Sequence, residues 1–142
     1  MIDFEFLDVE IPGFDSEFFM SSLESLIVLE NYKSGEITIV FCTDDYLLEI
    51  NKTYLNHDFY TDIITFDYSE NGVISGDLFI SVDRVNDNAG SFSVSVDNEL
   101  KRVIYHGVLH LCGYKDKTEN DENEMREKEN FYINQFVSRE TN

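Results

Sequence analysis

Two hydrophobic periods alternate along this chain, one of about two residues and one of three to four. Alternation at every second residue is typical of a half-buried strand, and spacing of three or four is typical of an amphipathic helix. Strand-like stretches fall within residues 1–10, 36–42, 63–68 and 76–82. Helix-like stretches fall at residues 15–30, 43–54, 83–89, 97–111 and from 118 to about 137. The pattern predicts an α+β fold, with a small mixed β-sheet of about four strands and helices packed on it.

Turn and capping residues separate these stretches. Ser34-Gly35 predicts a turn before a central strand, and Asn71-Gly72 predicts a hairpin turn between two antiparallel strands. Asp97 is placed to cap the fourth helix, and Thr118 to cap the last one. The fourth helix is apolar around nearly its whole circumference, which predicts that it is buried.

The composition agrees with one domain over residues 1–142. The chain has 142 residues, 42% of them hydrophobic, which suits a single core. It has no apolar run of about 18 residues, as a membrane-spanning helix needs. Its acidic first residues are unlike a signal peptide. We therefore expect a cytoplasmic protein with no membrane partner, in which Cys42 and Cys112 are buried thiols.

The net charge is −19, from 29 acidic and 10 basic side chains. By itself this charge argues against RNA binding, because Lys and Arg dominate contacts to phosphate. Four of the bases nevertheless bracket one stretch of the fourth helix: Lys101, Arg102, Lys115 and Lys117. They form either a local positive rim on an acidic protein or ordinary solvated charges at two helix ends. The sequence leaves both interpretations open.

Candidate metal ligands lie within that bracket. His106 and His110 are four residues apart, so a helix places both imidazoles on one face, where they can bind one metal ion. Gly113 suits the end of that helix, and a turn there can return Asp116 to the histidines. Three protein ligands leave a coordination position open, which is typical of catalytic zinc sites. Two alternatives stay open: hydrogen-bonded core histidines that bind no metal, and a ligand set with His57 or Asp121 in place of Asp116.

The spacing H-x-x-x-H-x-x-G-x-x-D is a metzincin-like zinc motif, but metzincin proteases follow their first histidine with a glutamate base. Gly107 stands at that position, so a peptidase would lack its base. A metal-bound water, in contrast, is itself a source of nucleophile. A carboxylate at Asp116 neutralises part of the metal's charge, so this water should be less acidic than over three imidazoles. We expect one zinc ion per chain, with manganese or iron also tolerated.

The segment H-G-V-L-H-L-C-G-Y, residues 106–114, resembles the signature H-G-x-L-H-L-x-G-Y-D-H of the YbeY family of metal-dependent endoribonucleases. Asp116 stands where that family has its third histidine, and Lys115 where it has aspartate. Residues 50–66 are similar to a second family signature. That stretch keeps the family's residues at Asn51, Tyr54, Asp58, Thr61, Asp62 and Phe66, but it has Leu55 in place of an arginine and Tyr60 in place of a proline.

The resemblance implies a single-strand-specific endoribonuclease that matures the 3′ end of small-subunit ribosomal RNA and acts in ribosome quality control. Its implied partners are ribosomal RNA, the small subunit and ribosome-associated proteins. The implied metal ligands, which act catalytically through a metal-bound water, are His106, His110 and Asp116.

The expected substrate contacts are Lys101, Arg102 and Lys115, with His57, when protonated, as a partial substitute for the absent arginine. Two rival functions remain at this point: a metal-dependent hydrolase of another substrate, and a non-catalytic ribosome-associated protein with a structural metal.

Overall fold

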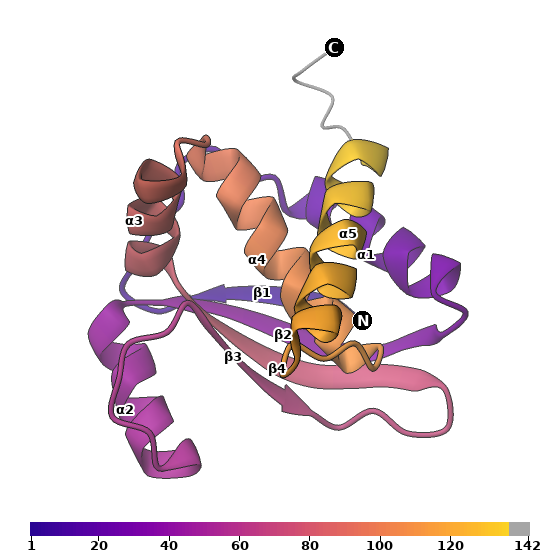
Figure 1. Cartoon of the computed structure of the whole chain (residues 1–142), viewed down its shortest axis with the longest axis horizontal. Coiled ribbons are helices and arrows are strands. Elements are labelled where there is room, and N and C mark those ends of the chain that lie inside the picture. The colour runs from indigo at the N-terminus through magenta and orange to yellow at the C-terminus, as the bar shows by residue number, and fades with distance from the viewer. Residues whose placement is uncertain (137–142) are drawn as a thin grey trace.

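A four-stranded mixed sheet carries helices on both of its faces (Figure 1). The computed structural model describes residues 1–136. In chain order the elements are β1 (Ile2–Phe6), α1 (Ser16–Leu29), β2 (Lys33–Cys42), α2 (Asp44–Leu55), β3 (Ile63–Asp67), β4 (Val73–Ser81), α3 (Val82–Phe92), α4 (Val96–Leu111) and α5 (Glu119–Gln135). The strand order is β1-β2-β4-β3, with β1 and β4 parallel to β2 and β3 antiparallel to β4. The predicted α+β class and the central position of the second strand are confirmed.

Alternation along β2 divides the hydrophobic core between the two faces of the sheet. Ile37, Ile39 and Phe41 belong to the larger core, which the sheet shares with α1, α3, α4 and α5. Cys42 belongs to a smaller core on the opposite face, which α2 closes with Leu47. Helix α4 packs against α1, α3, α5 and the strands β3 and β4. Contact on so many sides explains why this helix is apolar nearly all round, as predicted.

The predicted turn at Ser34-Gly35 is wrong. β2 begins at Lys33, because Lys33 and Ser34 already pair with β4 before an irregularity in the ladder. The chain turns earlier, at Asn31, whose φ is 70°. The hairpin turn at Asn71-Gly72 is confirmed, since both residues have positive φ, 53° and 79°, as a two-residue turn of the favoured type requires.

The predicted cap of the fourth helix is also wrong. Helix α4 is capped by Ser95, whose side chain accepts a hydrogen bond from the Asn98 backbone N–H at 3.0 Å. Asp97 lies in the first turn instead and pairs with Lys101 at 3.1 Å. Thr118 caps α5 as predicted, in a capping box with Asp121. The predicted end of that helix near residue 137 lies outside the described residues.

Cys42 and Cys112 are free, buried thiols, as predicted. Burial raises the pKa of each to about 12, so neither is a reactive thiolate at neutral pH. Within residues 1–136, no helix combines the length and the apolar character that crossing a membrane requires.

Gly107 lets α4 lie close to the sheet at the point between its two histidines. A Cβ atom at this position would lie 2.5 Å from Leu78 Cδ2 and 2.6 Å from Ile63 Cδ1. Leu78 is completely buried, so it has little room to move. Position 107 therefore faces β3 and β4, and the lack of a glutamate there has a packing reason.

Replacing Gly107 by alanine should lower the free energy of unfolding by roughly 1–3 kcal/mol, because the added methyl group overpacks the interface between α4 and the sheet. The matched control is Gly90→Ala on α3, where an added Cβ meets no atom within 4 Å. That change should stabilise the protein by about 0.5 kcal/mol through helix propensity. Urea denaturation of the two variants measures both effects, and equal midpoints would contradict the close approach at Gly107.

Candidate metal centre

The end of α4 brings three predicted side chains together. After the cap residue Cys112, Gly113 has φ 104° and reverses the chain. The Gly113 N–H donates to the His110 carbonyl at 3.0 Å and the Tyr114 N–H to the Leu109 carbonyl at 3.1 Å, which together satisfy the helix end. This reversal returns Asp116 to the histidines, as the sequence predicts.

One carboxylate oxygen faces both imidazoles. Asp116 Oδ2 lies 3.5 Å from His106 Nε2 and 3.3 Å from His110 Nε2, and the two rings are 4.6 Å apart at their centres. Histidine, cysteine and acidic side chains are the usual metal ligands, and among the described residues these three lie close enough together to share one ion. His57 and Asp121, the alternative third ligands, do not join it. Both histidine side chains are also partly exposed, at 22% and 25%, unlike fully packed core residues.

Hydrogen bonds on the far side of each ring determine which nitrogen faces Asp116. His110 Nδ1 lies 2.9 Å from the Tyr114 carbonyl oxygen, and His106 Nδ1 lies 2.7 Å from Glu129 Oε2. Both of these oxygens are acceptors, so each Nδ1–H donates to one of them, and a ring in its neutral form turns an Nε2 lone pair towards Asp116. A histidine whose outer N–H is held by a carboxylate or a carbonyl is the usual arrangement of a metal ligand.

The spacing of these atoms fits a metal ion. Two ligands that are each about 2.0–2.1 Å from a tetrahedral zinc ion lie about 3.3 Å from each other. The two nitrogen-to-oxygen distances, 3.3 Å and 3.5 Å, match that separation. Two lone pairs and an anion at this distance attract a cation rather than one another. The residues present therefore fit a mononuclear site with two nitrogen ligands and one oxygen ligand.

Glu129 on α5 supports the site from behind His106. Its side chain is 5% exposed and also accepts a hydrogen bond from Arg102 at 2.8 Å. Burial raises the pKa of Glu129, but the hydrogen bonds from His106 and Arg102 outweigh burial and lower it. Burial likewise lowers the pKa of His106, but Glu129, with Asp62 and Asp116, raises it above its ordinary value. The buried carboxylate is therefore ionised, and it increases the basicity of the His106 ring.

A second buried carboxylate anchors the loop that carries Asp116. Glu30, at the end of α1, accepts hydrogen bonds from the Tyr114 hydroxyl at 2.7 Å, from Lys128 at 3.1 Å and from the Tyr132 hydroxyl. Because the Tyr114 carbonyl holds His110, this network connects α1 and α5 to the second candidate ligand. The pKa of Glu30 is raised by burial but lowered below its ordinary value overall by these three donors.

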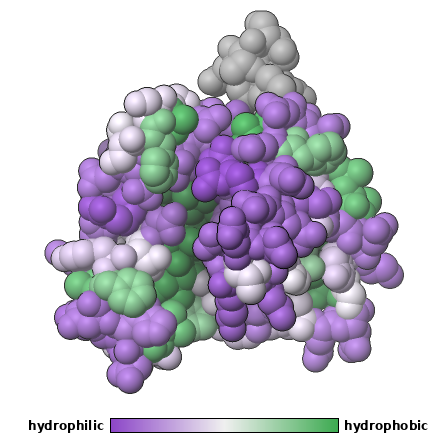
Figure 2. Space-filling view, in the orientation of Figure 1, coloured by the Kyte–Doolittle hydropathy of each residue, from purple (hydrophilic) through white to green (hydrophobic). Residues whose placement is uncertain are grey.

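The candidate metal centre opens into a cleft of about 420 Å³. Its walls come from α3, α4 and α5, and its lining includes His106, Asp116 and Asp62, the residue just before β3. Figure 2 shows a furrow to the left of α5 on this face, with hydrophobic residues along its floor and hydrophilic residues on its α5 side. Burial raises the pKa of Asp62. Two of the three candidate ligands, His106 and Asp116, are thus accessible from this cleft.

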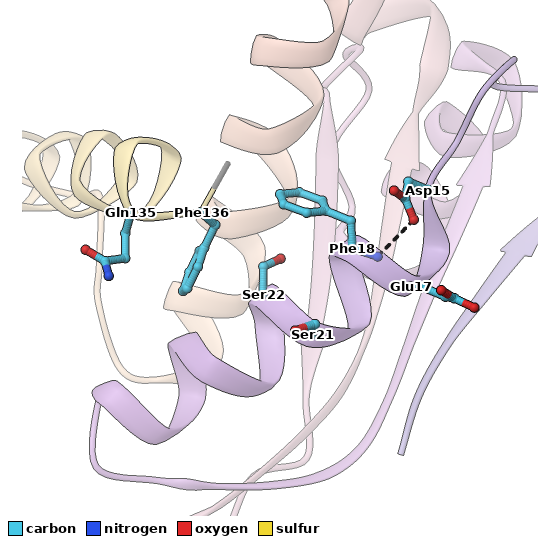
Figure 3. A pocket seen from close by; sticks show the side chains of 7 residues that line it. All are labelled: Asp15, Glu17, Phe18, Ser21, Ser22, Gln135 and Phe136. Carbon is cyan, nitrogen blue, oxygen red and sulfur yellow. Dashed lines mark hydrogen bonds between the residues drawn. The ribbon is translucent and has the colours of Figure 1, made fainter. Parts of the chain in front are cut away.

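A second hollow, of about 350 Å³, lies between α1 and the end of α5 (Figure 3). Its described lining residues contain two acidic side chains, Asp15 and Glu17, but no histidine or cysteine. Figure 3 shows that the Asp15 side chain is engaged with the Phe18 backbone N–H, at 3.0 Å, as the cap of α1. This hollow has no metal-binding chemistry comparable to that of the cleft.

The predicted basic rim is only partly formed. Lys101 corrects the expectation: it is buried, pairs with Asp97 and lies 5.2 Å above the Phe18 ring on α1, outside the cleft lining. Arg102 lines the cleft, but its guanidinium is held by Glu129 and by Asn130 at 2.9 Å.

Two other predicted substrate contacts are exposed. Lys115 lies in the loop beside Asp116. His57 is stacked on Phe59 in the loop after α2 and is outside the cleft lining. A role for Lys115 or His57 in substrate binding stays a prediction.

Sequence reasoning missed the supporting carboxylates. Met125 and Tyr132 mark the inner stripe of α5, and Glu129 lies on the same stripe, four residues after one and three before the other. The position of Glu129 on a buried stripe was the available signal. An unpaired charge is unfavourable there, so a buried acid indicates that partner side chains lie beside it. Glu30 gave a signal of the same kind: it follows the buried Leu26 and Ile27 at helical spacing, at the C-terminal end of α1, where the helix dipole disfavours an acid.

The fold and the site together define an α+β protein with a candidate His–His–Asp metal centre at the bottom of a cleft. The profile of the family Endoribonuclease YbeY matches residues 12–137. The Endoribonuclease YbeY of Flavobacterium johnsoniae is 50% identical over 136 residues, which cover 96% of this chain and 97% of that protein. The Endoribonuclease YbeY of Flavobacterium psychrophilum is 50% identical over 137 residues, which cover 96% of each.

Among solved structures, the protein TM1509 from Thermotoga maritima has a similar fold in solution. Its TM-score is 0.68 at 27% identity, over 96% of this chain and 89% of that one. The family match and these relatives show that this chain belongs to the YbeY family.

Glu129→Gln should weaken zinc binding by roughly 10–100-fold at neutral pH, because the neutral amide leaves the His106 ring less basic. It should also change the pH dependence. A proton on Nε2 excludes the metal, so the raised pKa of His106 makes the wild type lose zinc early on acidification. Removing the charge of Glu129 lowers the pKa of His106. As the pH is lowered, the zinc affinity of the variant should therefore begin to fall at a lower pH than the zinc affinity of the wild type.

Isothermal titration with zinc at several pH values between about 5 and 8 measures both effects. The matched control is Glu127→Gln, which removes one exposed charge from the same helix. Identical pH profiles for the two variants would contradict the role of Glu129.

Proposed function

We propose that this chain is a metal-dependent endoribonuclease that cleaves single-stranded ribosomal RNA, with His106, His110 and Asp116 as its metal ligands. Relatives at about 50% identity are named as endoribonucleases. The observation that carries the proposal is the convergence of two Nε2 lone pairs and one carboxylate oxygen at an open cleft. Zinc is the proposed ion, because two histidines and one carboxylate are an established catalytic zinc set.

The family membership also supports the more specific assignments. We assign the activity to maturation of the 3′ end of small-subunit ribosomal RNA and to ribosome quality control, in the cytoplasm and in association with the small subunit. Single-stranded RNA is the proposed substrate form, because its unstacked bases can enter a cleft between helices, whereas duplex bases are held within the stack.

When bound, a divalent ion supplies a Lewis acid that lowers the pKa of water and polarises a phosphoryl oxygen. The protein's own residues supply the orientation. Glu129 and the Tyr114 carbonyl hold the two imidazoles, so the ligand atoms are already in position before RNA binds. Asp62 lines the same cleft beside His106, and its raised pKa suits a carboxyl group that exchanges a proton with the substrate.

Two arginines, Arg102 and Arg126, line the cleft, but Arg102 is held by Glu129 and Asn130, so positive charge for the phosphate comes from Arg126. Arg126 is the more available of the two, since its side chain is 66% exposed and its contact with Glu129 is long, 3.9 Å. Leu55, at the position of the family arginine, supplies no charge. The absence of this arginine favours a second candidate function, that of a non-catalytic ribosome-associated protein with a structural metal.

Cleavage of a fluorescently labelled single-stranded RNA separates the two candidates. The zinc-loaded wild type should cut it and leave the matched duplex intact, whereas His110→Ala, purified in parallel, should be inactive. Activity that persists in His110→Ala would indicate a contaminating nuclease. A wild type that binds zinc and RNA but cuts neither substrate would favour the non-catalytic candidate.

Asp116→His should shift the pH profile of RNA cleavage to lower pH. A neutral imidazole cancels none of the metal's charge, so the water that supplies the nucleophile becomes more acidic than with a carboxylate ligand. Initial rates measured across pH test this directly. Glu119→His, which adds a histidine at an exposed position close by, is the control and should keep the wild-type profile. An unshifted profile in Asp116→His would count against Asp116 as a ligand.

A further inference from the structure

The cleft continues along α4 beyond the metal ligands. Glu99, Arg102 and His106 stand three and four residues apart, so they form one polar stripe along α4. Facing this stripe, α3 contributes Asn88 and Phe92, which are also four residues apart. Three helix faces therefore converge on a space that is larger than one metal ion and its ligands need.

Phe92 presents an aromatic surface to this space. It is the last residue of α3, it lines the cleft, and it is 61% exposed. Single exposed aromatic residues are common on protein surfaces and need no explanation by themselves. The distinguishing feature of Phe92 is that it shares one cleft with His106 and Asp116. Unpaired nucleobases bind proteins by stacking on such exposed rings.

Glu99 supplies an unsatisfied hydrogen-bonding group in the wall of the same cleft. The residue is only 3% exposed, and its Oε1 has no hydrogen-bond partner among the described residues. A buried carboxyl oxygen without a donor is unfavourable, so a donor brought by a ligand would be bound strongly. Burial raises the pKa of Glu99, which agrees with a carboxyl group that lacks compensating donors.

The remaining features suit a nucleotide. Arg126 on the rim can contact a phosphate, and the volume of about 420 Å³ is within the range of small-ligand pockets, about 300–1,000 Å³. A second metal ion does not fit as well. Among the described residues no other group of three histidine, cysteine or acidic side chains is close enough to share an ion, and two arginines line the cleft.

We propose that this cleft binds the base of the nucleotide next to the cleaved bond, with Phe92 stacked on the base and Glu99 bonded to its exocyclic amino group. The proposal rests on the RNA-cleaving function above and adds a base preference to it. Adenine, cytosine and guanine carry an exocyclic amino donor, whereas uracil has none. The subsite therefore favours the first three bases over uracil at one position of the substrate.

Binding of uncleavable RNA tests the subsite without requiring catalysis. The probe is a short, fluorescent 2′-O-methyl oligoadenylate, either intact or with one abasic residue at each position in turn, and the readout is fluorescence anisotropy with the zinc-loaded protein. In the wild type, one abasic position should weaken binding about tenfold, as expected for the loss of a stacked base.

Phe92→Ala should weaken binding of the intact probe to a similar extent, about tenfold, and should show no further loss at that abasic position. Phe92→Tyr should retain the wild-type affinity, because the stacking surface remains. Phe131→Ala is the matched control, since Phe131 is 51% exposed on α5 but outside the cleft lining. An equal effect of Phe92→Ala on intact and abasic probes, or no effect on either, would overturn the proposal.

Oligouridylate tests the role of Glu99. The wild type should bind it more weakly than oligocytidylate, whose pyrimidine ring is similar in size but carries the amino group, and Glu99→Ala should remove this difference, whereas Glu99→Gln, which keeps a carbonyl acceptor, should retain it. A preference that survives in Glu99→Ala, or no binding of either probe by the wild type, would overturn the proposal. Cleavage of unmodified RNA by the wild type is measured separately. If it fails while the binding pattern holds, the proposed function is wrong and the subsite stands.

Discussion

Two hydrogen bonds on the outer sides of the histidine rings determine the chemistry of this protein. Because Glu129 and the Tyr114 carbonyl accept hydrogen bonds from the Nδ1–H groups, both Nε2 atoms face Asp116. Without these acceptors, either ring could rotate or change tautomer, and the three candidate ligand atoms would not converge. The fold supplies both acceptors by packing α4 against the sheet and placing α5 and the loop at residues 113–118 beside it.

The same constraint explains where buried charge is found. Glu129 and Glu30 are acidic groups in largely apolar surroundings, and each is compensated by several donors from other elements. Arg102 and Lys128 are consequently engaged in structure rather than free to meet RNA. In a chain with a net charge of −19, this engagement leaves little positive charge at the cleft, and Arg126 becomes the main exposed cation there. The metal ion would then carry a large part of the attraction for phosphate.

Local patterns in the sequence predicted much of this architecture. The periods of β2 and α4 predicted the central strand and the buried helix, and Gly113 predicted the chain reversal that brings Asp116 to the histidines, because these features depend on neighbours within about one helical turn. The start of β2 and the cap of α4 were missed, since a long-range strand pairing and a competing serine decided them.

The prediction that Lys101 lies at the site was wrong because it used only proximity in sequence. Proximity in sequence does not show which face of a helix a side chain occupies, and its position five residues before His106 turns it towards α1. The cleft itself also lay beyond sequence reasoning, because residues of three helices meet there only in the folded chain.

The central claim is that three side chains of one chain bind one metal ion. Elemental analysis of the wild type and Asp116→Ala, purified side by side without chelator, tests it most directly, with circular dichroism to show that both are folded. About one zinc or other transition-metal ion per wild-type chain, lost from the variant, is the predicted result. Equal metal content in the two folded proteins, or no metal in the wild type, would contradict it.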